Sequence, residues 1–338
     1  MAHTEHPVAV IGAGVVGLAS AIRLREAGHP VTLFARDRTP ETTSDRSGAI
    51  FSPYRIDGSP SAAQWTTESF AVFAALADDS PTASGVTMGR MRELFVEPLD
   101  ADPWWSDIVE DFERLHNPPA PYVDGVRCIL PKMNIPRYVP WLEERFVGGL
   151  SGCIVTETIA SFQQLFDRGY HVIVNCSGLG ARELAHDAAM TPYRGQILRI
   201  RNTIGLSECL LEGGDDPNSA VGAYVFPFDD FVVLGGTFER GEENPVTEAA
   251  AIDGIVRRCA ALLKACNVAN AERLAADRIA ALAGIRPCRD NASAHEAVRL
   301  ERESLDCGRT IIHNYGHGRA GVTLSWGCAA EVVRLLAT

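Results

Sequence analysis

One glycine-rich turn near the start of the chain constrains the fold more than any other stretch. Residues 8–18 read VAVIGAGVVGL, an apolar run that breaks into a turn with glycines at 12, 14 and 17 and continues into helix-forming residues. In a strand–turn–helix unit of this kind, the first glycine permits a tight turn, the second lets the backbone approach a pyrophosphate and the third lets the helix pack on the strand. The pyrophosphate then lies at a helix N-terminus, where free N–H groups favour negative charge. The turn therefore predicts a dinucleotide site formed by Gly12, Gly14, Val15, Val16 and Gly17.

The stretch that follows completes the unit. Residues 31–35, VTLFA, are predicted to form the second strand, and Asp37 comes about 20 residues after Gly17, where an acidic residue binds the ribose in such units. Thr42, Thr43 and Ser44 are three consecutive hydroxyl residues. They either bind phosphate oxygens or cap a helix.

Composition excludes several classes of protein. The 338 residues carry a net charge of −12, which argues against nucleic acid as a partner. No apolar run reaches the roughly 18 residues that a membrane helix needs, and the first seven residues do not resemble a signal peptide. The nine cysteines contain no C-x-x-C pair, which argues against a disulfide framework or a zinc site and favours a reducing cytoplasm.

The rest of the chain predicts a second, largely antiparallel sheet. Residues 60–120 alternate a helical pattern with loops, a helix begins at Pro140, and residues 247–266 follow the helical period. Further strands are expected at residues 125–130, 171–177, 196–200, 223–226, 231–234 and 310–314. A second glycine-rich turn, residues 316–321, leads into a last helix, so both glycine turns could face one cofactor.

Several motifs together resemble one family, the FAD-dependent D-amino-acid oxidases. The motifs are VIGAGVVG (10–17), ARD (35–37) with TTS (42–44), GAIFSPY (48–54), VNCSG (174–178), RGQ (194–196), GIRP (284–287), VRLER (298–302), HNYGHG (313–318) and SWGC (325–328). The resemblance implies a doubly wound, Rossmann-like FAD domain interleaved with an antiparallel-sheet substrate domain. It places residues 1–55, 136–190 and 285–338 in the FAD domain, and residues 56–135 and 191–284 in the substrate domain.

The resemblance also implies how a substrate would be held. Arg286 matches the arginine that binds the substrate carboxylate, and a planar guanidinium suits that role because it donates two parallel hydrogen bonds. Tyr224 matches the tyrosine on the other side of that carboxylate. The alternatives are a structural salt bridge for Arg286 and a half-buried strand aromatic for Tyr224.

The same resemblance assigns cofactor contacts. Arg36, Asp37, Thr43 and Ser44 match contacts of the adenosine and pyrophosphate, with Asp37 favoured for the ribose. Residues 48–50 match the turn whose backbone faces the flavin, and the loop from Gly318 to Thr323 matches its pyrimidine end, whereas His317 is expected to serve in packing. The full set of implied cofactor residues beyond the first turn is Arg36, Asp37, Thr43, Ser44, Gly48, Ala49, Ile50, Ile159, Ser177, Gly178, Gly318, Arg319, Ala320, Gly321, Val322 and Thr323.

Two positions depart from the family pattern. Ala220 stands where many relatives carry a second tyrosine on a mobile lid, here expected at residues 212–222. Arg319 stands where relatives often have Gly or Ser, and its carbonyl would still accept a bond from the substrate amine. The Arg319 side chain either faces the substrate or points away into a salt bridge. Arg319 also resembles the arginine in the GHYRNG turn of glycine oxidases.

The activity implied is oxidative deamination of a D-amino acid. Hydride transfer to FAD and reoxidation by O2 would give H2O2, an imino and then 2-oxo acid, and ammonia, with no side chain required as acid or base and no metal. The partners implied are a D-amino acid and O2, without nucleic acid or membrane, and a homodimer stays open. The alternatives are a glycine oxidase, an oxidase of acidic D-amino acids, a biosynthetic amine oxidase and, more remotely, an NAD(P)-dependent dehydrogenase. Phe238 stands where D-aspartate oxidases carry an arginine, which argues against acidic substrates unless Arg319 replaces it.

Overall fold

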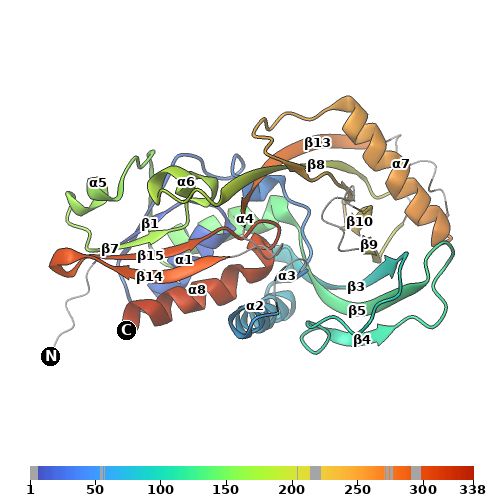
Figure 1. Ribbon diagram of the computed structural model, residues 1–338, viewed down its shortest axis with the longest axis horizontal. Helices are drawn as coiled ribbons and strands as arrows, with labels where there is room; N and C mark the ends of the chain where they lie inside the picture. The colour runs from blue at the N-terminus through green and yellow to red at the C-terminus, as the bar shows by residue number, and fades with distance from the viewer. Residues whose placement is uncertain are drawn as a thin grey trace.

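The computed structural model describes residues 7–53, 56, 58–203, 205–213, 222–269, 271, 274, 277–290 and 298–338. Two lobes lie side by side along the long axis of the molecule, each built on one β-sheet (Figure 1). A six-stranded sheet lies in the lobe that contains the C-terminus, and a nine-stranded sheet lies in the other. The α/β fold class predicted from the sequence is confirmed.

The six-stranded sheet is parallel apart from one edge strand. Its order is β14 (Arg299–Ser304), β15 (Thr310–Tyr315), β7 (Val172–Asn175), β1 (Val8–Ile11), β2 (Val31–Ala35) and β6 (Cys153–Thr156). Only β14 runs antiparallel to its neighbour. The strand β1 pairs with β2 and β7, and all four of its residues are buried. The turn after β1 therefore lies at the middle of the edge where the parallel strands end.

Helices cover both faces of this sheet. On one face α1 (Val15–Glu26) and α8 (Gly321–Ala337) share a core with Val8 and Val10, and on the other α5 (Phe162–Phe166) packs on Ala9 and Ile11. The two packed faces explain why β1 is apolar throughout rather than alternating. The helix α2 (Pro60–Asp79) lies against α8, where the Gly327 N–H donates to Ser69 Oγ at 2.8 Å.

The nine-stranded sheet forms the second lobe. Its path is β12 (Glu239–Arg240), β8 (Met190–Arg201), β11 (Phe231–Gly235), β10 (Tyr224–Pro227), β9 (Cys209–Gly213), β3 (Val86–Phe95), β5 (Asp124–Met133) and β4 (Glu110–Arg114), with β13 (Arg278–Arg289) paired to β8. The helix α7 (Ala249–Ala265) buries Ile252, Ile255 and Leu262 against one face. The opposite face shares its core with the first lobe.

The remaining elements are short. They are η1 (Thr43–Arg46), α3 (Pro81–Ser84), α4 (Ile135–Glu144), η2 (Arg145–Gly149), η3 (Gly178–Gly180), α6 (Ala181–Leu184) and η5 (Asp306–Gly308). Among the described residues, no helix is both long and apolar enough to span a membrane.

Two expectations about local structure were wrong. The sequence predicted a helix that begins at Pro140, but α4 begins at Ile135 with Pro136 in its first turn, and Pro140 lies inside it. Four apolar residues of α4 are buried: Ile135, Tyr138, Val139 and Leu142. Their burial compensates for the backbone hydrogen bond that Pro140 cannot donate. Seven strands were missed, namely β3, β4, β6, β9, β12, β13 and β14. In β3, charged residues such as Arg90 and Arg92 interrupt the alternating pattern. The division into two domains at the boundaries above stays a prediction.

Candidate active site

One cavity of about 1390 Å³ runs between the lobes and is lined by residues of both. It exceeds the ~300–1,000 Å³ of an ordinary small-molecule pocket, so it has room for a large cofactor together with a substrate. Both glycine turns line it, and a Cβ built at Gly321 of the second turn lies 3.9 Å from Val16 of the first. The two turns, at opposite ends of the sequence, thus belong to one site.

The first glycine turn fits a bound pyrophosphate. Gly12 has φ of +106°, and a Cβ there would lie 2.4 Å from the carbonyl oxygen of Cys176. A Cβ at Gly17 would lie 1.8 Å from the carbonyl oxygen of Gly12, so this glycine is required for α1 to approach the turn. Gly14 is the N-cap of α1 and has no side chain with which to cap it, which leaves the N-terminal dipole of the helix to an anion.

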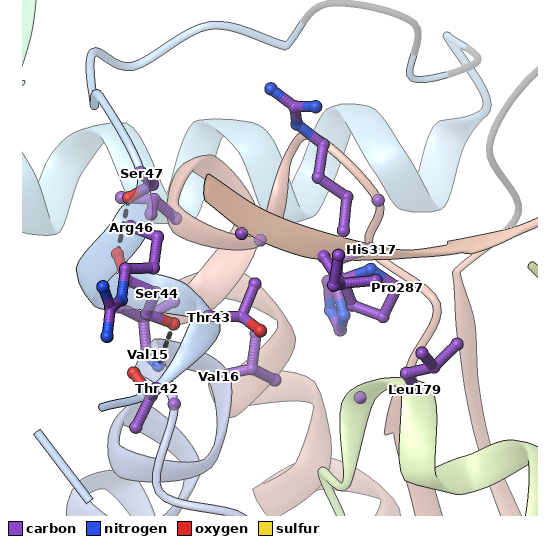
Figure 2. A pocket seen from close by; sticks show the side chains of 18 of the residues that line it. Val15, Val16, Thr42, Thr43, Ser44, Arg46, Ser47, Leu179, Pro287 and His317 are labelled. Atoms are coloured by element: carbon purple, nitrogen blue, oxygen red, sulfur yellow. Dashed lines mark hydrogen bonds between the residues drawn. The ribbon is translucent and has the colours of Figure 1, made fainter. Parts of the chain in front are cut away.

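The hydroxyl residues after β2 make different contacts. Thr42 is the N-cap of η1 and forms a capping box with Asp45, whose carboxylate accepts hydrogen bonds from the Thr42 N–H and hydroxyl. Ser44 Oγ accepts a hydrogen bond of 3.0 Å from the Val15 N–H and so ties η1 to the first turn of α1 (Figure 2). Thr43, Arg36 and Asp37 also line the cavity, and Arg36 Nε donates to the Asp37 carboxylate at 2.7 Å.

The segment expected to face the flavin is held in place by backbone bonds. The Met133 N–H donates to the Ala49 carbonyl at 3.0 Å, and the Phe51 N–H donates to the Pro131 carbonyl at 2.8 Å. Thr323 Oγ1 donates to the Ser52 carbonyl and accepts from the Ser52 N–H, which joins this segment to α8. Gly48, Ala49 and Ile50 line the cavity, as do the other predicted cofactor residues Ile159, Ser177, Gly178, Gly318, Arg319, Gly321, Val322 and Thr323. Ala320 is not among the lining residues and is buried in an apolar cluster.

His317, which the sequence assigned to packing, is buried beside Pro287 in the wall of the cavity (Figure 2). Burial lowers its pKa to about 4, so the imidazole is neutral at pH 7. Its Nε2 has no hydrogen-bond partner among the described residues. A neutral ring at this place adds no charge to the site.

Arg286 is held at the cavity by its neighbours. It lies on β13, paired with Tyr193 of β8, and its Nη1 donates to the Thr237 carbonyl at 3.0 Å. A Cβ at Gly195 would lie 2.0 Å from the same nitrogen, so the guanidinium crosses β8 only because residue 195 is glycine. A fixed guanidinium loses little freedom when it binds a carboxylate.

Tyr224 lies next to this arginine at the start of β10. Its ring stacks on Phe226 with centroids 4.6 Å apart, and its hydroxyl would collide with a Cβ at Gly236 at 2.7 Å. Burial raises the pKa of Tyr224, while the positive charges of Arg286 and Arg319 act in the opposite direction. The phenol is therefore protonated at neutral pH and can donate a hydrogen bond to an anion.

The Arg319 side chain lies in the wall of the cavity. Its guanidinium carbon is 3.4 Å from the centre of the Phe238 ring, and that of Arg286 is 5.6 Å from the same centre. Phe238 in turn stacks on Tyr193 at 4.2 Å. Two positive charges thus flank one phenyl ring, although contact of Arg319 with a substrate stays a prediction. Ala220 and most of the expected lid lie outside the described residues.

Sequence reasoning missed several residues of this wall. Thr237 and Gly195 position Arg286, and Gly235 makes room for Tyr224. Glycines inside strands indicate close approach by another group, and the glycine of RGQ and the two of LGGT carried that signal. Glu93 of β3 lines the same cavity and was not considered.

The parallel sheet, its central glycine turn and the large shared cavity are those of a dinucleotide-binding protein. The model of the family "FAD dependent oxidoreductase" matches residues 7–335. The chain belongs to this family, and FAD is its cofactor.

Full-length relatives agree with this assignment. A D-amino-acid oxidase of Rubrobacter xylanophilus is 39% identical over 329 residues, which cover 96% of this chain and 94% of that protein. A D-amino-acid oxidase of Streptomyces coelicolor is 36% identical over 97% of this chain and 96% of that protein. The solved glycine oxidase of Geobacillus kaustophilus shares the fold, with a TM-score of 0.76 at 19% identity over 98% of this chain and 95% of that one.

Proposed function

We propose that this chain catalyses the oxidative deamination of a D-amino acid, with 2-oxo acid, ammonia and H2O2 as the final products. The observation that carries the proposal is the pairing of Arg286 and Tyr224 in the wall of the FAD cavity. A guanidinium fixed on Thr237 and a protonated phenol beside it form a site for one carboxylate. The 39% identity to a D-amino-acid oxidase supports the same activity.

The residues of the chain orient the substrate rather than attack it. Arg286 binds the α-carboxylate through charge-assisted hydrogen bonds, and Tyr224 donates a further bond to it. The Arg319 carbonyl accepts a hydrogen bond from the α-amine, so two of the four groups on Cα are fixed and one enantiomer presents its hydrogen to the cofactor. When bound, FAD would supply the acceptor for that hydrogen as hydride and the route for the electrons to O2.

The cofactor contacts follow the same division of labour. The first turn of α1 would bind the pyrophosphate, Asp37 the ribose, and the segment from Gly48 to Ile50 with the loop from Gly318 to Thr323 would enclose the flavin. No side chain is assigned as acid or base. We also propose a cytoplasmic location, which the lack of a C-x-x-C pair among the nine cysteines supports, and we leave a homodimer as an option.

A peroxide assay tests the function directly. The purified holoenzyme is given each D-amino acid, its L-enantiomer, glycine and sarcosine, and H2O2 is measured. Oxidation of D-enantiomers alone supports the proposal, and oxidation of glycine alone would replace it with a glycine oxidase. A colourless protein that binds NAD(P) would overturn the proposal altogether.

One observation favours an alternative substrate class, the acidic D-amino acids. The two guanidiniums at Phe238 provide more positive charge than one carboxylate neutralises, which would suit an acidic D-amino acid. A preference for D-aspartate or D-glutamate over their amides in the same assay would favour it.

A further inference from the structure

A buried carboxylate lies in the cavity wall away from the arginines. Glu93 of β3 is 8% exposed and lines the same cavity as Tyr224. In the sheet, Tyr224 of β10 is opposite Leu211 of β9, and Leu211 is opposite Glu93. Since neighbouring strands are ~4.8 Å apart, the backbones of Tyr224 and Glu93 are about 10 Å apart along one cross-strand row.

The row faces the cavity rather than α7. Leu94, the next residue of β3, is buried in the core that α7 covers, whereas Met91, two residues before Glu93, is buried in the core shared with the first lobe. Successive side chains of a strand point to opposite faces, so Glu93 points with Met91. Leu211 and Tyr224 pack on the same core, and β10, β9 and β3 lie together in Figure 1.

The middle of the row is apolar. Leu211, which lies between Tyr224 and Glu93, lines the cavity and carries no charge, and Phe226, which also lines it, stacks on Tyr224. A substrate held by its α-carboxylate at Arg286 and Tyr224, with its amine at the Arg319 carbonyl, has its side chain left to extend along this row. Methylene groups fit an apolar wall, and the end of a long side chain would then meet the Glu93 carboxylate.

We propose that Glu93 is a specificity residue that binds the distal cation of the substrate. The preferred substrates are then D-amino acids with an ammonium or guanidinium group at the end of the side chain, such as D-ornithine, D-lysine and D-arginine. The proposal rests on the proposed function and narrows it to one substrate class.

The charges of the site agree with this class. A buried carboxylate is stabilised by an opposite charge, and because it has about four acceptor positions it can bind a ligand cation beside its contacts within the protein. Glu212 also lines the cavity, where its two oxygens accept bonds from the Tyr122 hydroxyl and the Ala223 N–H. An acidic side chain along the row would meet a like charge at Glu93, which disfavours D-glutamate.

A ligand series on the wild-type holoenzyme tests, without turnover, the distance between the carboxylate site at Arg286 and the Glu93 carboxylate. The probes are 4-aminobutanoate, 5-aminopentanoate and 6-aminohexanoate, each paired with the alkanoate that lacks the amine. None has an α-amino group, so none is a substrate, and binding is followed by the visible absorption of the bound flavin. We expect at least tenfold tighter binding of the amino compound at one length. Equal or tighter binding of the alkanoate at every length would overturn the proposal.

A variant tests the residue itself. In the wild type, we expect kcat/KM for D-lysine to exceed that for D-norleucine at least tenfold, because the two side chains differ in the terminal amine. Glu93→Gln should reduce this ratio at least tenfold. The matched control is Glu113→Gln, which removes the same charge from an exposed pair with Arg127 on the same sheet and should leave the ratio unchanged.

The outcomes separate the two levels of the proposal. If the folded, flavin-loaded Glu93→Gln variant keeps the wild-type ratio, or if the wild type prefers D-glutamate to D-lysine, the role of Glu93 is wrong. Oxidation of D-norleucine in the same experiment would leave the proposed function standing. If no D-amino acid is oxidised, the proposed function is wrong, and the ligand series still tests Glu93.

Discussion

The two ends of the cavity are built from different kinds of groups. The glycine-turn end, residues 12–17, consists of backbone: a turn that tolerates no Cβ at two positions and the N-terminus of α1. The arginine end, Tyr224, Arg286 and Arg319, consists of side chains from β10, β13 and the loop before α8. At one end the shape of the main chain makes the site, whereas at the other end the identity of single side chains does.

This difference assigns different tasks to the two ends. Backbone groups recognise what is common to a cofactor, because every chain can supply N–H groups at a helix N-terminus. Side chains recognise what is particular to a substrate, because charge, length and shape vary with each residue. Changes at the glycine-turn end should therefore affect FAD affinity, and changes at the arginine end should affect turnover and specificity.

The largest effect is expected at Arg286. Arg286→Ala removes the charged anchor of the α-carboxylate, and loss of one partner of a buried charge pair costs about 2–5 kcal/mol, or up to several thousandfold in kcat/KM. FAD content should stay at the wild-type level. The measurement is steady-state peroxide formation with a good D-amino acid. The control is Arg278→Ala on the same strand, whose arginine pairs with Asp253 at the surface. A variant within a few-fold of the wild type would show that the substrate is anchored elsewhere.

The stability of the protein should depend on pH through His317, which lies in the loop between β15 and α8. Its folded-state pKa of about 4 lies below the ordinary value of 6.5, so the folded protein binds the proton less readily than the unfolded chain. Above pH 6.5, His317 does not reduce the free energy of unfolding. As the pH falls from 6.5 toward 4, this free energy should decrease by about 3 kcal/mol.

Urea unfolding from pH 7 to pH 4 measures this loss. His317→Asn should flatten the pH dependence, whereas His116→Asn, at an exposed position, should not change it. The pKa of His313 is lowered by burial as well, so part of the slope should persist in both variants. Identical slopes for the wild type and His317→Asn would contradict the assignment.

Gly17→Ala tests the glycine-turn end. The new Cβ would lie 1.8 Å from the Gly12 carbonyl oxygen, so α1 must move away from the turn. Overpacking of this kind costs about 1–3 kcal/mol, and we expect FAD to bind roughly 10- to 100-fold more weakly. Flavin fluorescence titration of the apoprotein gives the affinity. Gly254→Ala in α7, where a Cβ meets no atom closer than 3.4 Å, is the control and should bind FAD normally. Normal affinity in Gly17→Ala would mean that the turn does not hold the cofactor.

The same contrast explains how much the sequence could predict. Four strands of the six-stranded sheet (β1, β2, β7 and β15), both glycine turns, α7 and α8 depend on patterns within a few residues, and these were found, whereas β6 and β14 were not. The capping by Thr42 was foreseen only as one of two options, since a hydroxyl near a helix start serves equally as a cap or a phosphate ligand. The structure shows the capping box with Asp45, and phosphate binding by Thr43 and Ser44 stays a prediction.

Local sequence patterns could not predict the contacts at the arginine end, because these contacts join strands that are distant in the sequence. Glu93 reaches the row of Tyr224 only through the parallel pairing of β3 with β9, and no turn or period in either segment sets that register. The stack of Arg319 on Phe238 likewise joins the loop before α8 to the turn between β11 and β12. The resemblance to a family supplied Arg286 and Tyr224, but not the neighbours that hold them.

Tyr224→Phe should give the smallest effect and sharpens the account of the arginine end. The ring keeps its stack on Phe226 and its place against Gly235, and only the hydroxyl is lost. A neutral hydrogen bond contributes about 1 kcal/mol, so kcat/KM should fall roughly fivefold, far less than in Arg286→Ala. The control is Tyr193→Phe, which loses a hydroxyl bonded to Asp290 but keeps its ring on Phe238, and should be nearly silent. If Tyr224→Phe is as damaging as Arg286→Ala, the phenol must do more than donate one hydrogen bond, because the geometry of its ring is unchanged.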